Sequence, residues 1–540
     1  MKRMAMGLTL VLGLLATPGA MAALKNPVRT DSGLVSGTSA GDPNLTAFWN
    51  LPYAAAPVGN LRWRPPAPVA PWSGVRAADH PGFTCPSPQD ADNPKATHSE
   101  DCLNVDVVTG ASSASERRPV MVWFHGGARG MGGESATTIN GAGLAKKGVV
   151  VVTVNYRGGP FGLLAIPELT QESGRNASGN YGLMDDIAAL KWIQRNIAAF
   201  GGDPHNVTII GQSFGAATCH FLTMSPLAKG FFQKMITESH SLYPHDPTMM
   251  EVAAKYKPLK DAEADGVRFM QIAGAKNLEE LRAMPWQKLV EAFNKSATPY
   301  DFMWSYVIDG YVLPRNFSET YAATAQADVP VLTGENRDEN RAAADTAFDL
   351  VAAGKAKRPD PRGSTAFLGL SAYRQYAQKR FGSMADEYLK LYPATSDREA
   401  FQSANAAIRD NQRISPWMWA TLFTAKRDKS VYLYFFTHAP PGPAHDMTGV
   451  YHAAEIPYAF NNPGAAWTEE DRRIADTMSS YWVNFARTGN PNGPGLPNWA
   501  AFDGKTEQTM ELGDHFQPIP LADPVKLDFW RRFYATQPAN

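Results

Sequence analysis

The chain has 540 residues, of which 44% are hydrophobic, enough for a large core. Charged residues make up 19% and aromatic residues 11%, a composition that excludes a disordered or low-complexity chain. The formal net charge of −1 argues against nucleic acid or an anionic membrane surface as the main partner. Three cysteines without a CxxC pair exclude a disulfide scaffold and give no sign of a zinc site.

The N-terminus has the pattern of a signal peptide. Lys2 and Arg3 form a basic start, Met4–Leu15 is a short apolar run, and Ala20–Ala22 is a small-x-small cleavage site. We therefore expect residues 1–22 to be removed, and a mature protein that begins near Ala23 in the periplasm or outside the cell. The apolar run is too short for a bilayer of ~30 Å, and no other stretch suits a span, so no integral membrane segment is expected after cleavage.

Short, strongly apolar runs recur along the chain with helical patterns between them, for example at Asp185–Ala198 and Glu469–Ala486. Such runs predict an α/β fold with a mostly parallel central sheet and helices on both faces. Segments 245–325 and 340–425 have mostly helical patterns, and we expect them to be insertions that cover the site within one domain of residues 23–540. The predicted strands are Pro119–Phe124, Val149–Val154, Val207–Ile210, Met235–Thr237, Val329–Leu332 and Val431–Phe436.

The sharpest motif is Gly211-Gln212-Ser213-Phe214-Gly215, which follows one predicted strand and opens a helix. In that context G-x-S-x-G is the nucleophile elbow of α/β-hydrolases. Glycines two residues either side of the serine avoid collisions with neighbouring backbone, and the helix N-terminus faces developing negative charge. Ser213 is therefore the predicted nucleophile.

A serine nucleophile needs a base and an acid, which follow it in the order serine, acid, histidine. His438, His445 and His452 all follow the strand that ends near Phe436, and position alone does not separate them. The acid is expected after the Val329–Leu332 strand, where the candidates are Glu335, Asp338 and Glu339.

The oxyanion of a tetrahedral intermediate needs amide donors. Phe124-His125-Gly126-Gly127-Ala128 follows the Pro119–Phe124 strand, at the position of an HGGG-type loop, and Phe214 follows the nucleophile.

Further motifs give the chain a specific resemblance that covers nearly all of the mature sequence. It resembles the type-B carboxylesterase family, which includes bacterial para-nitrobenzyl esterases, fungal lipases and cholinesterases. The motifs are Pro52-Tyr53-Ala54, Leu61-Arg62-Trp63-Arg64-Pro65-Pro66, Glu100-Asp101-Cys102-Leu103-Asn104, Asn155-Tyr156-Arg157, Gly179-Asn180-Tyr181-Gly182-Leu183-Met184-Asp185, Phe200-Gly201-Gly202-Asp203-Pro204, Tyr481-Trp482 and Phe485-Ala486-Arg487-Thr488-Gly489.

This resemblance implies an α/β-hydrolase that hydrolyses small carboxylic esters through an acyl-enzyme, without metal or organic cofactor and without nucleic acid. Its family pattern implies Glu339 as the acid and His452, before Glu-Ile-Pro-Tyr, as the base. It also implies four further assignments: oxyanion amides at Gly127, Ala128 and Phe214; a supporting serine at Ser239; a disulfide between Cys85 and Cys102; and a leftover Cys219 as a core thiol.

Three positions depart from the family pattern: Gln212 replaces an acid, Phe214 replaces an alanine and Ala128 replaces a glycine. Arg129, next to the oxyanion residues, stands where relatives carry an aromatic or apolar residue. It either pairs with a carboxylate such as Glu134 or binds an acceptor group on the substrate.

Two rival functions are an interfacial lipase and a non-catalytic adhesion or scaffold protein on the same fold.

Overall fold

The computed structural model describes residues 24–86, 97–127, 139–241, 243–250, 256–296, 304–339, 341–357, 369–442 and 445–539. The predicted signal peptide therefore lies outside the described residues, as do Ala128, Arg129 and Glu134.

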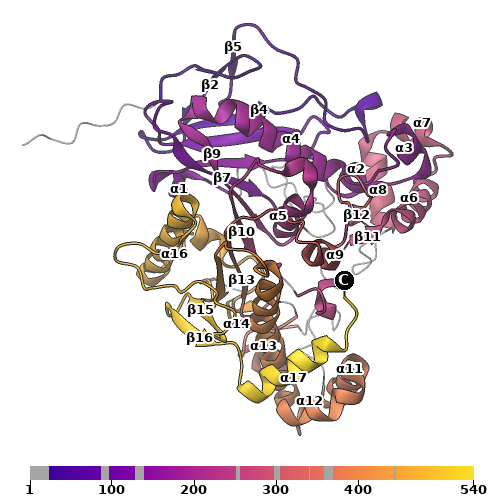
Figure 1. The fold of residues 1–540 in the computed structure, drawn as a ribbon, viewed down its shortest axis with the longest axis vertical. Coiled ribbons are helices and arrows are strands. Elements are labelled where there is room, and N and C mark those ends of the chain that lie inside the picture. The colour runs from indigo at the N-terminus through magenta and orange to yellow at the C-terminus, as the bar shows by residue number, and fades with distance from the viewer. Residues whose placement is uncertain are drawn as a thin grey trace, which may run out of the picture.

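The centre of the molecule is a mixed sheet, in the order β16-β15-β14-β13-β10-β9-β7-β8-β6-β4-β3 (Figure 1). The strands from β8 across to β15 run parallel to one another, and apolar runs predicted all of them except β15. The strands are β3 (Thr38–Ser39), β4 (Thr46–Pro52), β6 (Asn104–Thr109), β7 (Arg118–Phe124), β8 (Val150–Val154), β9 (Gly202–Gln212), β10 (Lys234–Glu238), β13 (Val331–Asn336), β14 (Val431–Phe436), β15 (Gln508–Leu512) and β16 (Gln517–Pro520).

Both edges of the sheet are antiparallel, which the sequence analysis did not predict. β3, β4, β6 and β8 pair antiparallel in turn at one edge, and β15 pairs antiparallel with β16 at the other. Apart from β8, these strands carry polar residues or prolines among the apolar ones, as in Gln517–Pro520 with its two prolines, so they lack the continuous apolar pattern of the centre.

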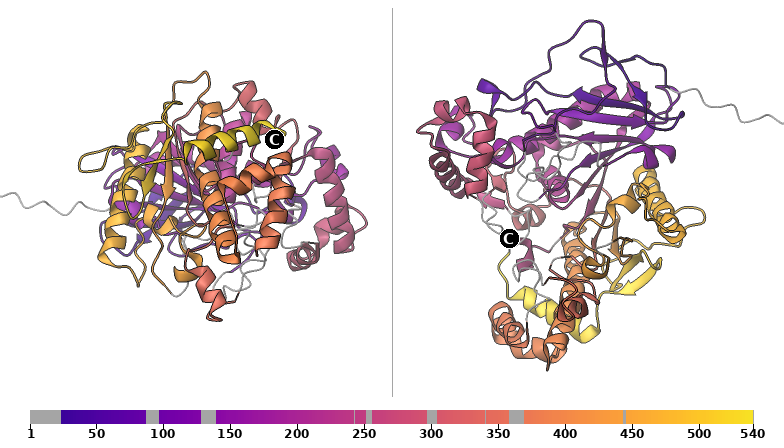
Figure 2. Two further views of the ribbon diagram at one scale, coloured as in Figure 1. Left: turned by 90° about the horizontal axis from the view of Figure 1, so that it is seen from below. Right: turned by 180° about the vertical axis from the view of Figure 1, so that it is seen from behind.

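Side chains of β7 alternate between two separate cores, which shows that the sheet is covered on both faces. Val120, Val122 and Phe124 belong to one core, with α4 (Tyr181–Asn196), α5 (Phe214–Met224) and α13 (Asp397–Phe423). Met121 and Trp123 belong to the other, with α1 (Ala142–Lys146) and α16 (Glu469–Thr488). The predicted layered α/β arrangement is confirmed (Figures 1 and 2).

The two segments expected to be helical contain two helix groups at opposite parts of the molecule (Figure 1). The first group also holds a short parallel pair, β11 (Tyr256–Pro258) and β12 (Tyr306–Ile308), which the sequence analysis did not predict. The helices are α6 (Leu259–Ala273), α7 (Leu278–Ala283), α8 (Trp286–Ser296), α9 (Phe317–Ala322), α10 (Ala347–Ala352), α11 (Leu370–Phe381), α12 (Ala385–Leu391) and α13, and the C-terminal α17 (Pro524–Ala535) packs with the second group.

The remaining short elements lie in the connections: β1 (Val28–Arg29), β2 (Leu34–Ser36), β5 (Val75–Ala77), α2 (Gly159–Leu163), α3 (Pro167–Glu172), α14 (His445–Thr448) and α15 (Ile456–Ala459). In the part of the chain that the structure describes, no helix combines the length and apolarity needed to cross a bilayer.

The structure contains the disulfide between Cys85 and Cys102, with Cα atoms 5.0 Å apart. Cys219 is a buried free thiol on α5, and burial raises its pKa well above the usual value. A thiol held protonated in the core is a poor nucleophile, in agreement with its interpretation as a core residue.

Candidate active site

Ser213 stands at a sharp turn between β9 and α5, at the carboxyl end of the parallel strands. Its φ of 57° and ψ of −121° place a non-glycine residue in a strained region of backbone space. Its N–H donates to the Glu238 carbonyl at the end of β10 (2.9 Å), and its carbonyl accepts from Ala217 within α5 (3.0 Å). These bonds hold the turn and leave the serine on the C-terminal edge of the sheet.

The two glycines of the elbow are required by close backbone approach. A Cβ on Gly211 would overlap the backbone of Gly215, and a Cβ on Gly215 would overlap the Phe124 carbonyl at the end of β7. A Cβ on Gly126 would come 3.2 Å from that of Ser213, so the loop after β7 lies directly against this serine. The steric reason given for the motif is thus visible in the structure.

His452 is the candidate histidine that contacts a candidate acid. Its Nδ1 is hydrogen-bonded to Oε2 of Glu339, a buried carboxylate. The other oxygen of Glu339 accepts the N–H of Asn336 (2.5 Å), and its backbone carbonyl accepts from Gln412 of α13 (2.7 Å). Loss of hydration lowers the pKa of His452, but the hydrogen bond and charge of Glu339 outweigh this effect and raise it.

The other two candidate histidines have different partners. His438 lies between Asp514 (Nδ1, 2.7 Å) and Asp471 (Nε2, 2.9 Å). His445 is bonded to the carbonyl of Pro440 at 3.0 Å.

The neighbouring carboxylates are also engaged elsewhere. Asp338 pairs with Arg337 (3.0 Å) and Arg409 (2.5 Å) and accepts the N–H of Val450 (2.9 Å). Asp338 thus anchors the loop that carries His452, two residues after Val450. Glu335 is buried within β13, where it precedes the turn that carries Glu339.

Gln212, the residue before Ser213, contacts the imidazole of His452. Its amide nitrogen lies 3.2 Å from Nε2 of His452 and 3.4 Å from Nδ1. No hydrogen bond joins the Ser213 hydroxyl to His452 in this structure. The departure at position 212 therefore places a neutral amide against the imidazole.

The predicted oxyanion residues are only partly described. Gly127 has a φ of 140°, a conformation that L side chains rarely adopt, while Ala128 and Arg129 lie outside the described residues. Phe214 is the first residue of α5, and its ring stacks on Tyr306 with centroids 5.0 Å apart. The ring of Phe214, which replaces the alanine of the family pattern next to Ser213, is thus buried against β12.

His125, directly before the glycines, is held by Tyr156. The two rings stack at 4.2 Å, and the Tyr156 hydroxyl donates to the His125 carbonyl (2.5 Å). Burial lowers the pKa of His125 to about 4, so this imidazole is neutral near pH 7. It fixes the loop rather than transferring protons.

Ser239 follows β10 at the same edge of the sheet, with a φ of 62° and a buried hydroxyl that has no hydrogen-bond partner among the described residues. Its backbone N–H donates to the Gly334 carbonyl of β13 (2.8 Å). The hydrogen bond that the resemblance implied for this hydroxyl is not made in this structure.

Sequence reasoning missed Asn336 and Glu455. The Asn336 amide group donates to the Tyr451 carbonyl (2.9 Å) and to Glu455. Burial, followed by the charge of Glu339, raises the pKa of Glu455 to about 7. The spacing His452-x-x-Glu455 was the available signal, but a carboxylate on a loop gives no sign of burial. In the described parts of the chain, no group of His, Cys, Asp or Glu is placed to hold a metal ion.

Comparison with known proteins adds an independent line of evidence. The model of the carboxylesterase family matches residues 25–530. The chain is 33% identical to a fumonisin B1 esterase of Sphingopyxis macrogoltabida, over 88% of this chain and 85% of that protein. It is 30% identical to the para-nitrobenzyl esterase of Bacillus subtilis, over 90% of this chain and 94% of the relative.

Solved structures agree with the sequence comparison. A para-nitrobenzyl esterase structure has a TM-score of 0.74 and 29% identity, over 94% of this chain and 99% of the other. A Geobacillus stearothermophilus carboxylesterase has a TM-score of 0.74 and 29% identity, over 95% of this chain and all of the other.

Proposed function

Because the chain belongs to the carboxylesterase family and is a carboxylic-ester hydrolase, we propose that it acts as a serine esterase through Ser213, His452 and Glu339. The observation that carries the proposal is the His452–Glu339 hydrogen bond at the strand edge where the elbow presents Ser213. Neither of the other two candidate histidines has a comparable position.

The reaction begins when Ser213 Oγ attacks the ester carbonyl and His452 Nε2 takes its proton. For this step the Gln212 amide must leave Nε2, so that the serine hydroxyl takes its place. We expect this exchange at Nε2 to occur when substrate binds next to Gln212, since hydrogen bonds of catalytic groups often tighten only in the substrate complex.

Glu339 performs two tasks in this scheme. It accepts a hydrogen bond from Nδ1–H of His452, which leaves Nε2 as the lone-pair atom that faces the serine. It also stabilises the imidazolium that forms when the proton is taken. Its own orientation is fixed by the Asn336 N–H.

The tetrahedral oxyanion is stabilised by the amides of Gly127, Ala128 and Phe214. When the tetrahedral intermediate collapses, the alcohol leaves and receives the proton from His452. Water activated by the same imidazole then hydrolyses the acyl-enzyme.

The test uses three variants: Ser213→Ala, His452→Ala and the double variant. Each single change should lower kcat by about 10⁴–10⁶-fold, and the double variant should be little worse, because the residues act as a unit. A fluorophosphonate should add one mass increment on Ser213. Substantial turnover by folded Ser213→Ala contradicts the assignment.

We also propose that the protein is exported, with cleavage before Ala23. The Cys85–Cys102 disulfide supports this, because such bonds persist in oxidising compartments. N-terminal sequencing of the protein recovered from its native host decides the point. A start at Met1 in the cytosolic fraction contradicts it.

A further inference from the structure

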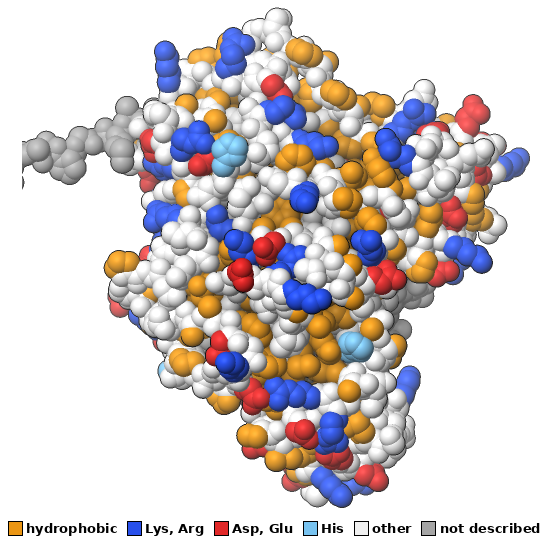
Figure 3. Space-filling model, in the orientation of Figure 1, with side chains coloured by type: hydrophobic (Ala, Val, Ile, Leu, Met, Phe, Trp, Pro, Cys, Tyr) orange, Lys and Arg blue, Asp and Glu red, His pale blue; other side chains and the backbone are white. Residues whose placement is uncertain are grey.

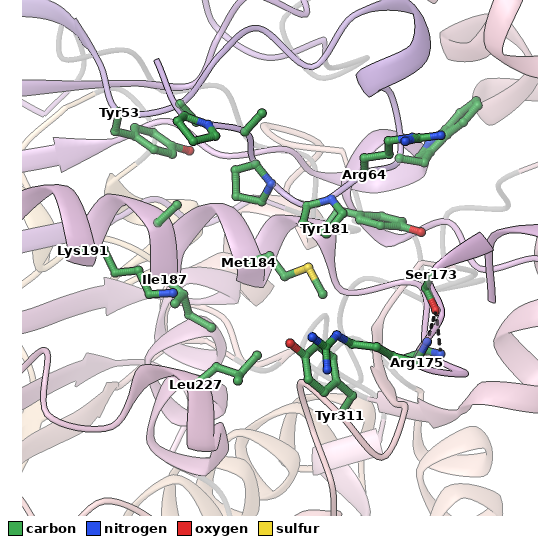
Figure 4. A pocket seen from close by; sticks show the side chains of 18 of the residues that line it. Tyr53, Arg64, Ser173, Arg175, Tyr181, Met184, Ile187, Lys191, Leu227 and Tyr311 are labelled. Atoms are coloured by element: carbon green, nitrogen blue, oxygen red, sulfur yellow. Dashed lines mark hydrogen bonds between the residues drawn. The ribbon is translucent and has the colours of Figure 1, made fainter. Parts of the chain in front are cut away.

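A cavity lies away from the proposed catalytic residues, on the outward side of α4 (Figure 4). It has a volume of about 660 Å³, which is within the usual range of ligand pockets. None of Ser213, His452 and Glu339 lines it. The opposite side of α4 packs against α5 and β9, so the helix separates the cavity from the elbow.

The floor of the cavity is an apolar strip along α4. Met184, Ile187 and Ala188 line it, at the spacing that places residues on one helix face, and Lys191 ends the strip. From Met184 to Lys191 the strip runs about 10 Å along the helix axis, at ~1.5 Å per residue. The opposite walls come from the loop of Tyr53 and Arg64 and from Leu227 and Tyr311 (Figure 4).

The charges that line the cavity are unbalanced. Four cationic side chains face two carboxylates: Arg64, Arg175, Lys191 and Arg195 against Asp31 and Glu172. Figure 3 likewise shows basic side chains among hydrophobic ones on the surface over α4.

Both carboxylates are already paired with arginines. Asp31 binds Arg195 (2.7 Å), while Glu172 binds Arg282 (2.6 Å) and Arg64 (3.3 Å). Within the described part of the chain, no carboxylate pairs with Arg175 or Lys191.

Arg175 is nevertheless held in place. Its guanidinium lies over the Tyr311 ring, 4.6 Å from the ring centroid, and the close-up shows it reaching across the cavity toward that ring. Stacking on an aromatic face leaves the edge donors of a guanidinium free for a planar acceptor such as a carboxylate. The Lys191 ammonium, near Phe231 (5.8 Å), adds positive potential.

We propose that this cavity is a second binding site for an amphipathic carboxylate, whose alkyl chain lies on the α4 strip and whose head group binds Arg175. The apolar strip suits the alkyl chain of such a ligand, and the cations without a carboxylate partner suit its carboxylate head group. This site does not depend on the catalytic assignment.

The test is calorimetric titration of the full-length mature protein with dodecanoate, below its micelle concentration. Arg175→Ala should weaken binding about tenfold or more, and Lys191→Ala should weaken it less. Ala188→Phe, which fills the cavity without changing charge, should abolish it. Arg29→Ala removes an exposed arginine outside the cavity and should leave binding unchanged.

Hydrolysis of p-nitrophenyl acetate by these variants should stay at the wild-type rate, because the cavity is not the catalytic site. Dodecanol should bind at least tenfold more weakly than dodecanoate. Unchanged dodecanoate affinity in Arg175→Ala and Lys191→Ala, or equal affinity for dodecanol, overturns the proposal. If Ala188→Phe does not fold, as judged by circular dichroism, the two charge variants decide.

Discussion

Replacing Glu339 with glutamine tests the acid of the proposed triad most directly. The glutamine is nearly the same size, but the structure dictates how its amide must turn. One carboxylate oxygen of Glu339 accepts the Asn336 N–H and the other accepts from His452 Nδ1. Because the amide oxygen is needed by Asn336, the NH₂ group faces His452.

That orientation reverses the proton position on the imidazole. An NH₂ group donates to Nδ1, so the ring proton moves to Nε2, the atom that must accept the Ser213 proton. The imidazolium also loses a charge-assisted hydrogen bond of about 1.5–3 kcal/mol. In a serine protease triad the matching change costs about 10⁴ in kcat, and we expect about 10³–10⁴ here.

The assay is kcat/KM for p-nitrophenyl acetate between pH 5 and 9. In the unsubstituted enzyme, activity should fall as pH drops through the raised pKa of His452, because only the neutral ring is a base. Glu339→Gln removes the hydrogen bond and the charge that contribute most to that elevation, so the acid limb should also move to lower pH.

The matched control is Glu335→Gln, also a buried glutamate of the same segment, which should stay within a few-fold of the unsubstituted rate. Asp338→Asn is a poorer control, since its two arginine pairs and its bond to Val450 hold the His452 loop. Glu339→Gln activity within tenfold of the unsubstituted enzyme at pH 8 refutes the reasoning.

Three further outcomes are expected. Thiol titration of the unfolded, unreduced mature protein should find one thiol, Cys219; finding three would exclude the disulfide. Although burial lowers the pKa of His438, its bonds to Asp514 and Asp471 raise it overall, so its stabilisation is complete below pH ~6.5 and is lost as pH rises through the folded-state pKa. His438→Gln should thus lower the unfolding free energy by about 1 kcal/mol at pH 6 and by less at pH 9, as measured by urea titration, and a pH-independent difference would contradict this. If Arg129 binds substrate, Arg129→Leu should lower kcat/KM about tenfold for esters with a free carboxylate and leave neutral esters of equal size unchanged; an unchanged ratio rejects that role.

The parallel strands from β8 across to β14 were predictable because each contains a run of apolar residues that is buried on both faces. Val431–Phe436, for example, is an unbroken apolar run and forms a strand with the same bounds. The edge strands escaped prediction because an edge needs only one apolar face and tolerates proline, as β16 shows.

The sequence by itself determined the elbow, since a serine between glycines at 211 and 215, after an apolar strand and before a helix, is a recognisable local pattern, although the Phe124 carbonyl that crowds Gly215 lies on another strand. Without the family resemblance, position along the chain did not select the base among three histidines or the acid among three carboxylates. Only the tertiary structure places His452 against Glu339, gives His438 and Asp338 other partners, and sets the Gln212 amide at the imidazole. These contacts join residues more than a hundred positions apart or on different elements, so they arise from how parallel strands bring their carboxyl ends together, which no local pattern encodes.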